Sequence, residues 1–543
     1  MIMSGYYNNA VVKLIVAGLL ASFLSACAGS SLPRLKPTDA LEPDKGFVII
    51  RIINNVDFVS QNFDRSWVGL PIRLKTNEGD RKFGFTRDLS ATMGSTQIFL
   101  GQLPQGTYDL LELNVISIHG NRRYYSWLPL DKLGTFKVVP GHITNLGTII
   151  CQPVGGRLYQ FIHINNDTEV QELIKNNYPV VYKGASGKGM IGWDNSWDNK
   201  SLLENIFIAP SDYPKSLESK VAQKDILYKS TALSFAKEHS AGFNNPRQIA
   251  TGEIFAGSKL GQVLVKERDG KWTQLDTGFT REITAVLPIN RNIIYAGGEE
   301  GLLLVTNDGG KSWKRVETPL KTSILFIEQI SGRFFIGGDL FYETRNIAGN
   351  NWRAIDAIKL NNTYRGTIPS NKLNYPEYTS YIDNGKFYLF IPYSNTIFVL
   401  DLSTNIWSTI KTSFDNGNVY SLKNGFLYNV GYSLWFGPRI VVSHDFGNSW
   451  ITTHDMLGVL YSPIFKDNQN AFVLRFNPIS RNVILRKSND GGKSWEEVND
   501  FNDLELPHPS KLFYDYVNNK LYFAVDGMIY IASDDLKSWT KVR

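Results

Sequence analysis

The chain has 543 residues, of which 43% are hydrophobic and 20% are charged, and this balance excludes both a largely disordered chain and a protein with many membrane-spanning helices. The length predicts two or three domains, because one hydrophobic core seldom grows beyond about 250 to 300 residues. The formal net charge is only +6, without a block of Lys and Arg that could follow phosphates, so we expect no nucleic-acid partner.

The N-terminal segment is predicted to be an export signal. Lys13 precedes an apolar run over residues 14–24, which is too short to span a bilayer and typical of a signal peptide. The run ends in Leu24-Ser25-Ala26-Cys27, which resembles the lipobox of bacterial lipoproteins. The resemblance implies that residues 1–26 are removed and that Cys27 carries diacylglycerol and a further acyl chain such as palmitate, so that the lipid anchors the protein to a membrane. Ala28 follows the cysteine, and by the family's sorting rule this implies the outer membrane of a two-membrane bacterium, on a side that the sequence does not reveal.

Residues 27–45, rich in Ser, Pro and Lys, are expected to form an extended tether between the lipid and the folded part. Residues 46–152 then show short strands of period two with turns between them, and with 13% aromatic residues and 46 glycines in the chain we expect an all-β fold. The expected strands are 47–53, 68–74, 96–100, 108–115 and 148–151. The segment resembles the transthyretin-like or immunoglobulin-like β-sandwich modules of bacterial lipoproteins. Cys151, which has no disulfide partner once Cys27 is lipidated, is interpreted as a buried, inert thiol.

Residues 153–244 are predicted to be a mixed connector with short helices. A helix is expected over 165–178, with Asp167 as its N-cap and Glu169 in its first turn, and Pro179 ends it. A second helix is expected around 215–223.

A repeated motif appears from residue 245 to the C-terminus. Residues 306–313, 443–450 and 488–495 all fit the pattern (Ser/Thr)-x-Asp-x-Gly-x-(Ser/Thr)-Trp. The motif residues are Asp308, Gly310, Trp313, Asp445, Gly447, Trp450, Asp490, Gly492 and Trp495. Weaker copies end at Trp272, Trp352, Trp407 and Trp539, so that seven tryptophans follow one another at intervals of 39 to 55 residues. One four-stranded propeller blade uses about 40 to 50 residues, and the spacing therefore predicts seven blades over residues 245–543.

The motif resembles the Asp-box, or bacterial neuraminidase repeat, of the sialidase-like β-propellers. We interpret its aspartate as a structural group that accepts hydrogen bonds from its own turn, and its tryptophan as filling the space between blades. Six or eight blades remain alternatives, because the longest interval, from Trp352 to Trp407, could contain an insertion. The ring is expected to close either by direct packing of the last blade on the first or by a strand from before Asn245.

Each motif copy is expected in the turn between the third and fourth strands of a blade, so the hairpins between the second and third strands point to the opposite face. That hairpin face is the candidate binding face. The polar and aromatic residues expected on it are Lys259, Glu299, Glu300, Asp339, Tyr393, Trp435, Arg439 and Arg481. Glu299 and Glu300 are adjacent and are interpreted as a solvated hairpin instead of a glycosidase pair.

Two functions are compatible with these patterns. Sialidases hold the sugar carboxylate with three arginines and start their propeller with an Arg-Ile-Pro motif. The nearest match here, Asn244-Asn245-Pro246-Arg247, has a changed order. Arg365 and Arg439 are candidates for the binding face, but the sequence places no Tyr/Glu pair and no acid loop. We therefore favour a non-catalytic envelope protein whose propeller is a scaffold for a protein or glycan partner. In this it resembles the assembly-factor propellers of photosynthetic organisms, which share the sequence motif Asn-Asp-Gly-Gly-Lys-Ser-Trp. An exo-sialidase or related glycoside hydrolase acting on envelope or host glycans is the alternative, and no catalytic residue is assigned.

No metal or cofactor is expected. The seven histidines show no metal-ligand spacing, and the oxygen-rich stretch 194–198 lacks the distal Glu and central Gly of a calcium loop.

Overall fold

The computed structural model describes residues 30–543 with interruptions. The segments outside the description are 56–65, 75–80, 89–95, 120–121, 130–134, 156–157, 194–200, 206–231, 348, 350, 357, 359–377, 392–395, 412–416, 422–426, 434–436, 446–448, 453–458, 461–462, 477–481, 502, 505–510 and 526. Cys27, the signal segment, Arg365 and the stretch 194–198 therefore lie outside the described residues.

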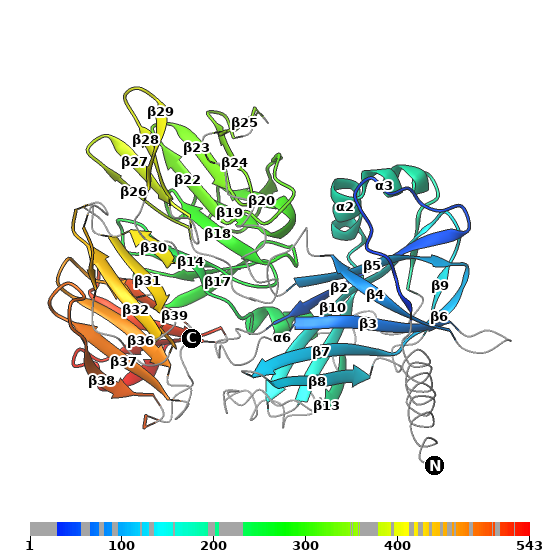
Figure 1. The fold of residues 1–543 in the computed structure, drawn as a ribbon, viewed down its shortest axis with the longest axis horizontal. Helices are drawn as coiled ribbons and strands as arrows, with labels where there is room; N and C mark the ends of the chain where they lie inside the picture. The colour runs from blue at the N-terminus through cyan, green and yellow to red at the C-terminus, as the bar shows by residue number, and fades with distance from the viewer. Residues whose placement is uncertain are drawn as a thin grey trace, which may run out of the picture.

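The described strands of the N-terminal domain are hydrogen-bonded into one connected sheet (Figure 1). They are β1 (Ser30–Ser31), β2 (Lys45–Asn54), β3 (Ser66–Leu74), β4 (Arg81–Asp88), β5 (Thr96–Pro104), β6 (Gly106–Leu110), β7 (Glu112–His119), β8 (Arg122–Pro129), β9 (Thr135–Val138), β10 (Ile143–Gly155), β11 (Leu158–Ile164), β12 (Met190–Gly192) and β13 (Ser201–Asn205). The order along the main path is β13-β11-β10-β2-β5-β4-β3-β6-β9. Strand β4 pairs with β3 through its first half and with β5 through its last residues, which links the two parts of the sheet.

Strand β2 is buried on both faces, and its alternating side chains enter two different cores. Val48, Ile50 and Ile52 pack with residues of β5, β6 and β9, among them Phe99, Tyr108 and Phe136. On the other face, Phe47 and Ile49 pack in one core with two helices, Asp167–Asn177 through Val170, Leu173 and Ile174, and Pro179–Ala185 through Val181 and Ala185. The domain therefore has a helical layer on one side of its central strands, which the expectation of a plain β-sandwich did not include.

The α-helices among the described residues are α2 (Asp167–Asn177), α3 (Pro179–Ala185) and α6 (Ala232–Glu238). Helix α2 confirms the helix expected over 165–178, but its N-cap is Asn166 and Asp167 is the first helical residue. The Asp167 carboxylate instead accepts a hydrogen bond from Asn145 Nδ2 at 2.6 Å, so tertiary contact has replaced the expected cap. The helix expected at 215–223 lies outside the described residues.

The segment 153–244 is not an independent connector between domains. Strand β11 pairs with β10, β12 pairs with β10, and β13 pairs with β11, so three of its strands extend the N-terminal sheet. The sequence patterns could not reveal this, because the partners of these short strands are distant in the chain.

The C-terminal part is a seven-bladed β-propeller, and each blade is an antiparallel sheet of consecutive strands. Blade 1 contains β14 (Asn244–Gln248), β15 (Ile254–Gly257), β16 (Gln262–Lys266) and β17 (Trp272–Asp276). Blade 2 contains β18 (Ile283–Pro288), β19 (Ile294–Gly298), β20 (Leu303–Thr306) and β21 (Lys314–Arg315), with the 3-10 turn η2 (Glu299–Gly301) between β19 and β20. Blade 3 contains β22 (Phe326–Ile330), β23 (Arg333–Gly337), β24 (Phe341–Thr344) and β25 (Arg353–Ala354).

The remaining four blades repeat this arrangement. Blade 4 contains β26 (Thr379–Asp383), β27 (Lys386–Phe390), β28 (Thr396–Asp401) and β29 (Ile406–Lys411). Blade 5 contains β30 (Gly417–Ser421), β31 (Leu427–Ser433), β32 (Gly437–Ser443) and β33 (Ile451–Thr452). Blade 6 contains β34 (Val459–Leu460), β35 (Ile464–Phe465), β36 (Ala471–Phe476), β37 (Val483–Ser488) and β38 (Glu496–Asp500), and blade 7 contains β39 (Lys511–Asp515), β40 (Lys520–Val525), β41 (Met528–Ala532) and β42 (Trp539–Lys541).

Seven tryptophans lie between successive blades, each at or just before a fourth strand. Trp313 packs among residues of blades 1 and 2, Trp407 among those of blades 3 and 4, and Trp539 among those of blades 6 and 7. Trp272, Trp352, Trp450 and Trp495 occupy the corresponding places at the other blade junctions. Each blade junction is thus an apolar core of its own.

The ring closes by direct packing of blade 7 on blade 1. Phe513, Tyr522 and Ile529 of blade 7 share one core with Phe243 and Trp272. A buried ion pair joins the same two blades, with Lys266 Nζ 2.9 Å from an Asp515 carboxylate oxygen. Every strand of blade 7 comes from its own sequence, so no strand is borrowed to close the ring.

The long interval between Trp352 and Trp407 does not contain an eighth described blade. Between β25 and β26 the chain passes through residues 359–377, which lie outside the description, and β26 then begins blade 4.

No helix among the described residues combines the length and the apolar character that crossing a membrane requires.

Candidate functional site

The two faces of the ring are defined by chain topology. Turns between the third and fourth strands lie on one face, which we call the turn face. Hairpins between the second and third strands, together with the links from one blade to the next, lie on the opposite, hairpin face. The N-terminal domain contacts the hairpin face at blades 1 and 2 through α2, α6 and the end of β2 (Figure 1).

Glu299 and Glu300, expected in a solvated hairpin, are instead buried, with exposed fractions of 0% and 3%. The expectation was wrong because the N-terminal domain covers this hairpin. Thr96 of β5 donates to Glu299 Oε2 at 2.6 Å, and Arg51 of β2 lies 3.3 Å from Glu300 Oε1. Lys259, expected on the same face, is also buried, and its Nζ donates to the Asn54 carbonyl at 3.2 Å.

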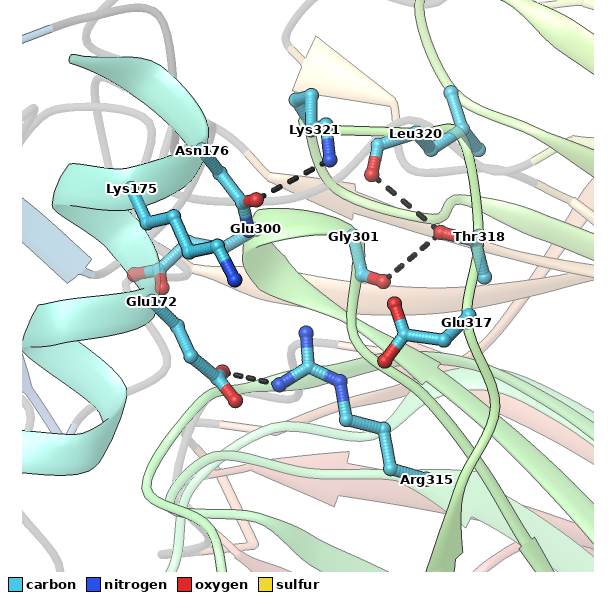
Figure 2. Close-up of a pocket in the computed structure, with 10 residues that line it drawn as sticks. All are labelled: Glu172, Lys175, Asn176, Glu300, Gly301, Arg315, Glu317, Thr318, Leu320 and Lys321. Carbon is cyan, nitrogen blue, oxygen red and sulfur yellow. Dashed lines mark hydrogen bonds and ion pairs between the residues drawn. The ribbon is translucent and has the colours of Figure 1, made fainter. Parts of the chain in front are cut away.

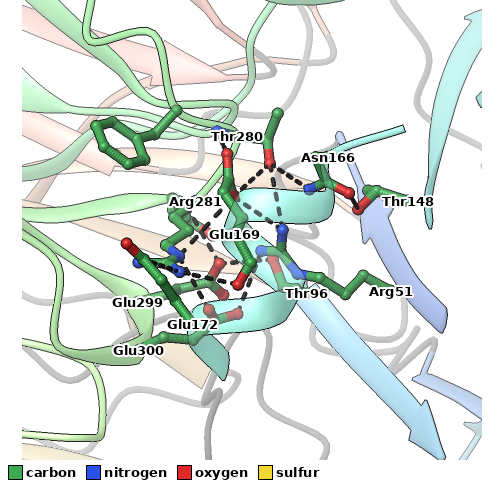
Figure 3. A network of polar contacts seen from close by, with 12 residues as sticks. Arg51, Thr96, Thr148, Asn166, Glu169, Glu172, Thr280, Arg281, Glu299 and Glu300 are labelled. Atoms are coloured by element: carbon green, nitrogen blue, oxygen red, sulfur yellow. Dashed lines mark hydrogen bonds and ion pairs between the residues drawn. The ribbon is translucent and has the colours of Figure 1, made fainter. Parts of the chain in front are cut away.

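The contact between the domains is a network of charged side chains, shown in Figure 3. Glu169 of α2 accepts from Arg51 Nη1 at 2.9 Å and from the Thr280 backbone N–H at 2.9 Å. Arg281, in the link from blade 1 to blade 2, holds Glu300 with its Nε at 2.9 Å. Its Nη2 also donates to Glu172 at 3.0 Å. Helix α2 is thereby bound to both β2 and the propeller.

Burial and charge oppose each other in this network. Burial alone would raise the pKa of Glu169, but the nearby Arg51 and Arg281, with the hydrogen bonds from Thr280, lower the pKa below its ordinary value. Burial would likewise lower the pKa of Arg51, whereas Glu300, Glu169 and Glu299 raise it. Glu169 and Arg51 are therefore both held in their charged forms.

A strained backbone accompanies these contacts. Glu300 has φ of 57°, in the left-handed region that residues with a side chain rarely adopt. The next residue, Gly301, has φ of 70°, and a Cβ there would lie 2.0 Å from the Leu320 carbonyl oxygen. The hairpin is therefore shaped to place Glu300 against Arg51 and Arg281.

A second set of contacts joins the end of β2 to α6 and to blade 1. The Asn55 amide donates to the Ala236 carbonyl at 2.9 Å and accepts from the Ala241 N–H at 2.9 Å. Beside it, Ile53, Ile150 and Ile162 pack with Ala236 and with Leu260 of blade 1. The end of β2 is thus anchored by both polar and apolar contacts.

A small cavity of about 100 Å³ lies next to the charged network, between α2 and blade 2 (Figure 2). Lys175 and Asn176 of α2 face Arg315, Thr318 and Lys321 across it. Arg315 pairs with Glu172, and Lys321 donates to Asn176 Oδ1 at 3.2 Å. Cations and carboxylates balance around this space, which favours a part of the interface over a ligand site.

The aspartates of the repeated motif accept hydrogen bonds from groups in their own turns. Asp308 Oδ1 accepts from Thr306 Oγ1 at 2.7 Å and from the Ser312 N–H at 3.0 Å, and its Oδ2 accepts from Ser312 Oγ at 2.5 Å. These hydrogen bonds lower the pKa of Asp308. Asp445 and Asp490 make the same three kinds of contact with their own turns.

The glycine of the motif is required by a close approach between blades. Gly310 has φ of 91°, and a Cβ at this position would lie 2.6 Å from Leu275 Cδ1 of the preceding blade. Gly492 likewise has a positive φ, of 85°. Gly447 lies outside the described residues.

Two of the other candidates for the binding face, Asp339 and Arg439, are among the described residues and lie on different blades. Asp339, between β23 and β24, accepts from Thr322 Oγ1 at 2.5 Å, and Arg439 lies in β32 of blade 5. Tyr393, Trp435 and Arg481 lie outside the described residues. Of the described candidates, Glu299 and Glu300 lie together in blade 2, whereas Asp339 lies in blade 3 and Arg439 in blade 5.

Arg247, the nearest match to the first sialidase arginine, lies in β14, the innermost strand of blade 1. Its Nη1 is 3.1 Å from Glu328 Oε2 of blade 3, and Ser380 of blade 4 donates to the same oxygen at 3.0 Å. The arginine is thus paired with a carboxylate across the centre of the ring.

Cys151 is fully buried in β10, and burial raises the pKa of its thiol well above the ordinary value. Among the residues that the structure describes, no three His, Cys, Asp or Glu side chains are placed to hold a metal ion.

The interface residues Arg51, Thr96, Thr280 and Arg281 were missed by sequence reasoning. Arg51 did carry a signal, since it is a charged residue inside the apolar strand Phe47-Val48-Ile49-Ile50-Arg51-Ile52-Ile53. A buried charge needs a partner, but the sequence cannot say that the partners lie on α2 and on blade 2.

Several solved structures are similar to this chain over about half of its length. No protein-family model and no curated protein matches the chain. Among solved structures, YCF48 from Cyanidioschyzon merolae is similar, with 14% identity, coverage of 53% of this chain and 94% of that chain, and a TM-score of 0.38. A GH74 xyloglucanase from Xanthomonas campestris shows 12% identity, coverage of 52% and 50%, and a TM-score of 0.39. BamB from Moraxella catarrhalis shows 14% identity, coverage of 55% and 84%, and a TM-score of 0.34. The chain is a seven-bladed propeller that carries a β-rich N-terminal domain on one face.

Proposed function

We propose that this protein is a lipid-anchored envelope protein whose propeller is a non-catalytic scaffold for a protein or glycan partner. Cys27 carries the lipid, the outer membrane is the location, and the repeated turns are of the Asp-box type. The partner binds the hairpin face at blades 3 to 6, to which Asp339, Tyr393, Trp435, Arg439 and Arg481 belong by their positions in the chain.

The observation that carries the proposal is the use of Glu299 and Glu300 in the domain interface. Glu299 and Glu300 are adjacent carboxylates that the sequence already disfavoured as a glycosidase pair, and both are buried against Thr96, Arg51 and Arg281. Hydrolysis needs two carboxylates that flank a substrate bond, one acting as an acid. A pair that holds two domains together serves a structural purpose and supports a scaffold.

The fixed position of the N-terminal domain supports the same function. Its contacts reach blades 1, 2 and 7, so a partner of the hairpin face is directed to blades 3 to 6. Because the N-terminal domain follows the proposed anchor directly in the chain, it would hold the ring in one orientation relative to the membrane.

The partner test uses the chain with its signal segment removed as a bait for envelope extracts after chemical crosslinking. We expect one partner to be enriched by the wild-type chain and lost with Asp339→Arg or Arg439→Glu. The control variant Lys311→Glu changes an exposed residue on the turn face and should keep the partner. Equal capture by all three variants would contradict the proposed binding face.

The competing activity is tested with a fluorogenic sialoside and a panel of aryl glycosides. A scaffold should release no more product than buffer alone. Turnover that is removed by substitution of a hairpin-face residue would overturn the scaffold and establish a hydrolase.

Lipidation is tested separately, by incorporation of labelled palmitate into the full chain expressed in a two-membrane bacterium. The wild-type chain should be labelled and should sediment with outer membranes, whereas Cys27→Ser should be neither. Labelling of the variant would exclude Cys27 as the anchor.

A further inference from the structure

A concave site of about 390 Å³ lies on the turn face of blade 3, away from the domain interface. Its walls include Arg333 of β23, Glu343 of β24 and Arg353 of β25, and the turn before β25 adds Arg345 and Asn346. Asn405, from the corresponding turn of blade 4, closes the other side. The volume is in the range of sites that bind small molecules.

The turn of blade 3 differs from those of the other six blades in its charge. Each of the others contains an aspartate in or directly beside the turn between the third and fourth strands. They are Asp269, Asp308, Asp401, Asp445, Asp490 and Asp535. Blade 3 has no acidic residue between Glu343 and Trp352, and Asn346 stands where Asp308 stands in blade 2, two residues after the threonine that ends the third strand. This turn alone therefore adds no negative charge to its surface.

The arginines of the site outnumber its one carboxylate. Arg333 and Arg353 both pair with Glu343, at 3.2 Å from Oε2 and 2.7 Å from Oε1. Arg333 is largely buried, and its guanidinium lies 5.4 Å from the centre of the Phe335 ring. Its Nη1 also contacts the Asn405 side-chain oxygen. Arg333 is thus held in place by three neighbours.

Arg345 is exposed at the mouth of the site, and no described carboxylate pairs with it. Three arginines against one glutamate leave two positive charges in excess. Guanidinium groups bind the oxygens of carboxylates and phosphates through paired hydrogen bonds, whereas the amide groups of asparagines both donate to and accept from hydroxyl groups.

We propose that this site on blade 3 binds a small acidic sugar, with the arginines on its carboxylate or phosphate group and the asparagines on its hydroxyls. Arg345 supplies the unpaired charge, Arg353 the second guanidinium, and Asn346 and Asn405 the polar contacts. The site lies on the face opposite to the proposed partner surface, so it does not depend on the proposed function.

The experiment is titration calorimetry of the purified chain with D-glucuronate, D-glucose 6-phosphate and D-glucose. We expect binding of one or both acidic sugars at millimolar concentration and at least tenfold weaker binding of glucose. Preference for glucuronate would identify a carboxylate ligand, and preference for glucose 6-phosphate a phosphate ligand. Absence of binding by both acidic sugars, or equal binding of glucose, would overturn the proposal.

Three variants connect the binding to this site. Arg345→Gln and Asn346→Asp, which restores the aspartate of the other turns, should each weaken the acidic sugars about tenfold, since each reduces the net positive charge by one. Lys311→Gln removes an exposed cation from the equivalent turn of blade 2 and should leave affinity unchanged. Thermal unfolding of each variant checks that its fold is retained, and equal loss in the blade 2 control would show that binding reflects overall charge instead of this site.

Discussion

The contacts between neighbouring blades and the contact between the two domains are built from different chemistry. Blade junctions are apolar cores, each with one tryptophan, and they recur seven times around the ring. The domain contact occurs once and depends on Arg51, Arg281, Glu169 and Glu300, all of them buried. Burial of apolar surface is favourable wherever two surfaces fit together. Buried ion pairs add little net stability, but an arrangement that leaves one of their charges buried without its partner is strongly destabilised. The ring should therefore owe its stability to the blade junctions, and its fixed orientation to the charged network.

The largest effect is expected at the junction that closes the ring. Trp272→Ala should destabilise the propeller by about 3 to 5 kcal/mol, because it removes a buried aromatic side chain from a packed core. Trp272 is 8% exposed and contacts Phe243, Phe513 and Tyr522. Urea unfolding followed by fluorescence measures the change, and Trp272→Phe should recover most of the loss. A change below about 1 kcal/mol would mean that this junction does not hold the ring closed.

A smaller effect, confined to the domain contact, is expected for Glu169→Gln. The change leaves Arg51 and Arg281 buried with one carboxylate fewer, which should cost about 3 kcal/mol of docking free energy. Hydrogen exchange of α2 and of the hairpin at 299–301 should accelerate, while exchange in blades 4 to 7 stays unchanged. Glu317→Gln, at an exposed position beside the network, is the matched control. Faster exchange throughout the ring would show that the two kinds of contact are not separate.

The smallest effect is a pH dependence of the domain contact. The folded pKa of Glu169 is below its ordinary value of 4.5, so its contribution is complete above about pH 4.5 and is lost as the pH falls through the folded pKa. We expect acid to weaken docking before it disrupts the apolar cores, and hydrogen exchange at α2, corrected for intrinsic rates, measures this between pH 6 and pH 3. In Glu169→Gln this part of the pH dependence should be absent. An identical acid response in both proteins would assign the effect to other carboxylates.

The ring was predictable because its information is local and repeated. Each motif, such as the one from Thr306 to Trp313, specifies one turn and one inter-blade side chain, and seven tryptophans at blade-length intervals define seven blades. The hairpin carboxylates were misjudged for the opposite reason. Nothing near Glu299 or Glu300 in the chain shows that Thr96 and Arg51, which lie more than 200 residues earlier, will cover them. Asp167 was predicted to be a helix N-cap from its neighbours in the chain alone. In the structure its carboxylate instead accepts a hydrogen bond from Asn145, which is distant in the sequence.

The amino-acid sequence by itself favoured seven blades over six or eight and predicted the form of their turns and the place of each tryptophan, because those features follow from hydrogen bonds and packing within about one blade. Only the tertiary structure decided which part of the hairpin face is covered, how the segment after residue 152 joins the N-terminal sheet, and where three arginines gather around Glu343. These depend on pairings between residues far apart in the chain, and such pairings are selected by the packing of whole domains.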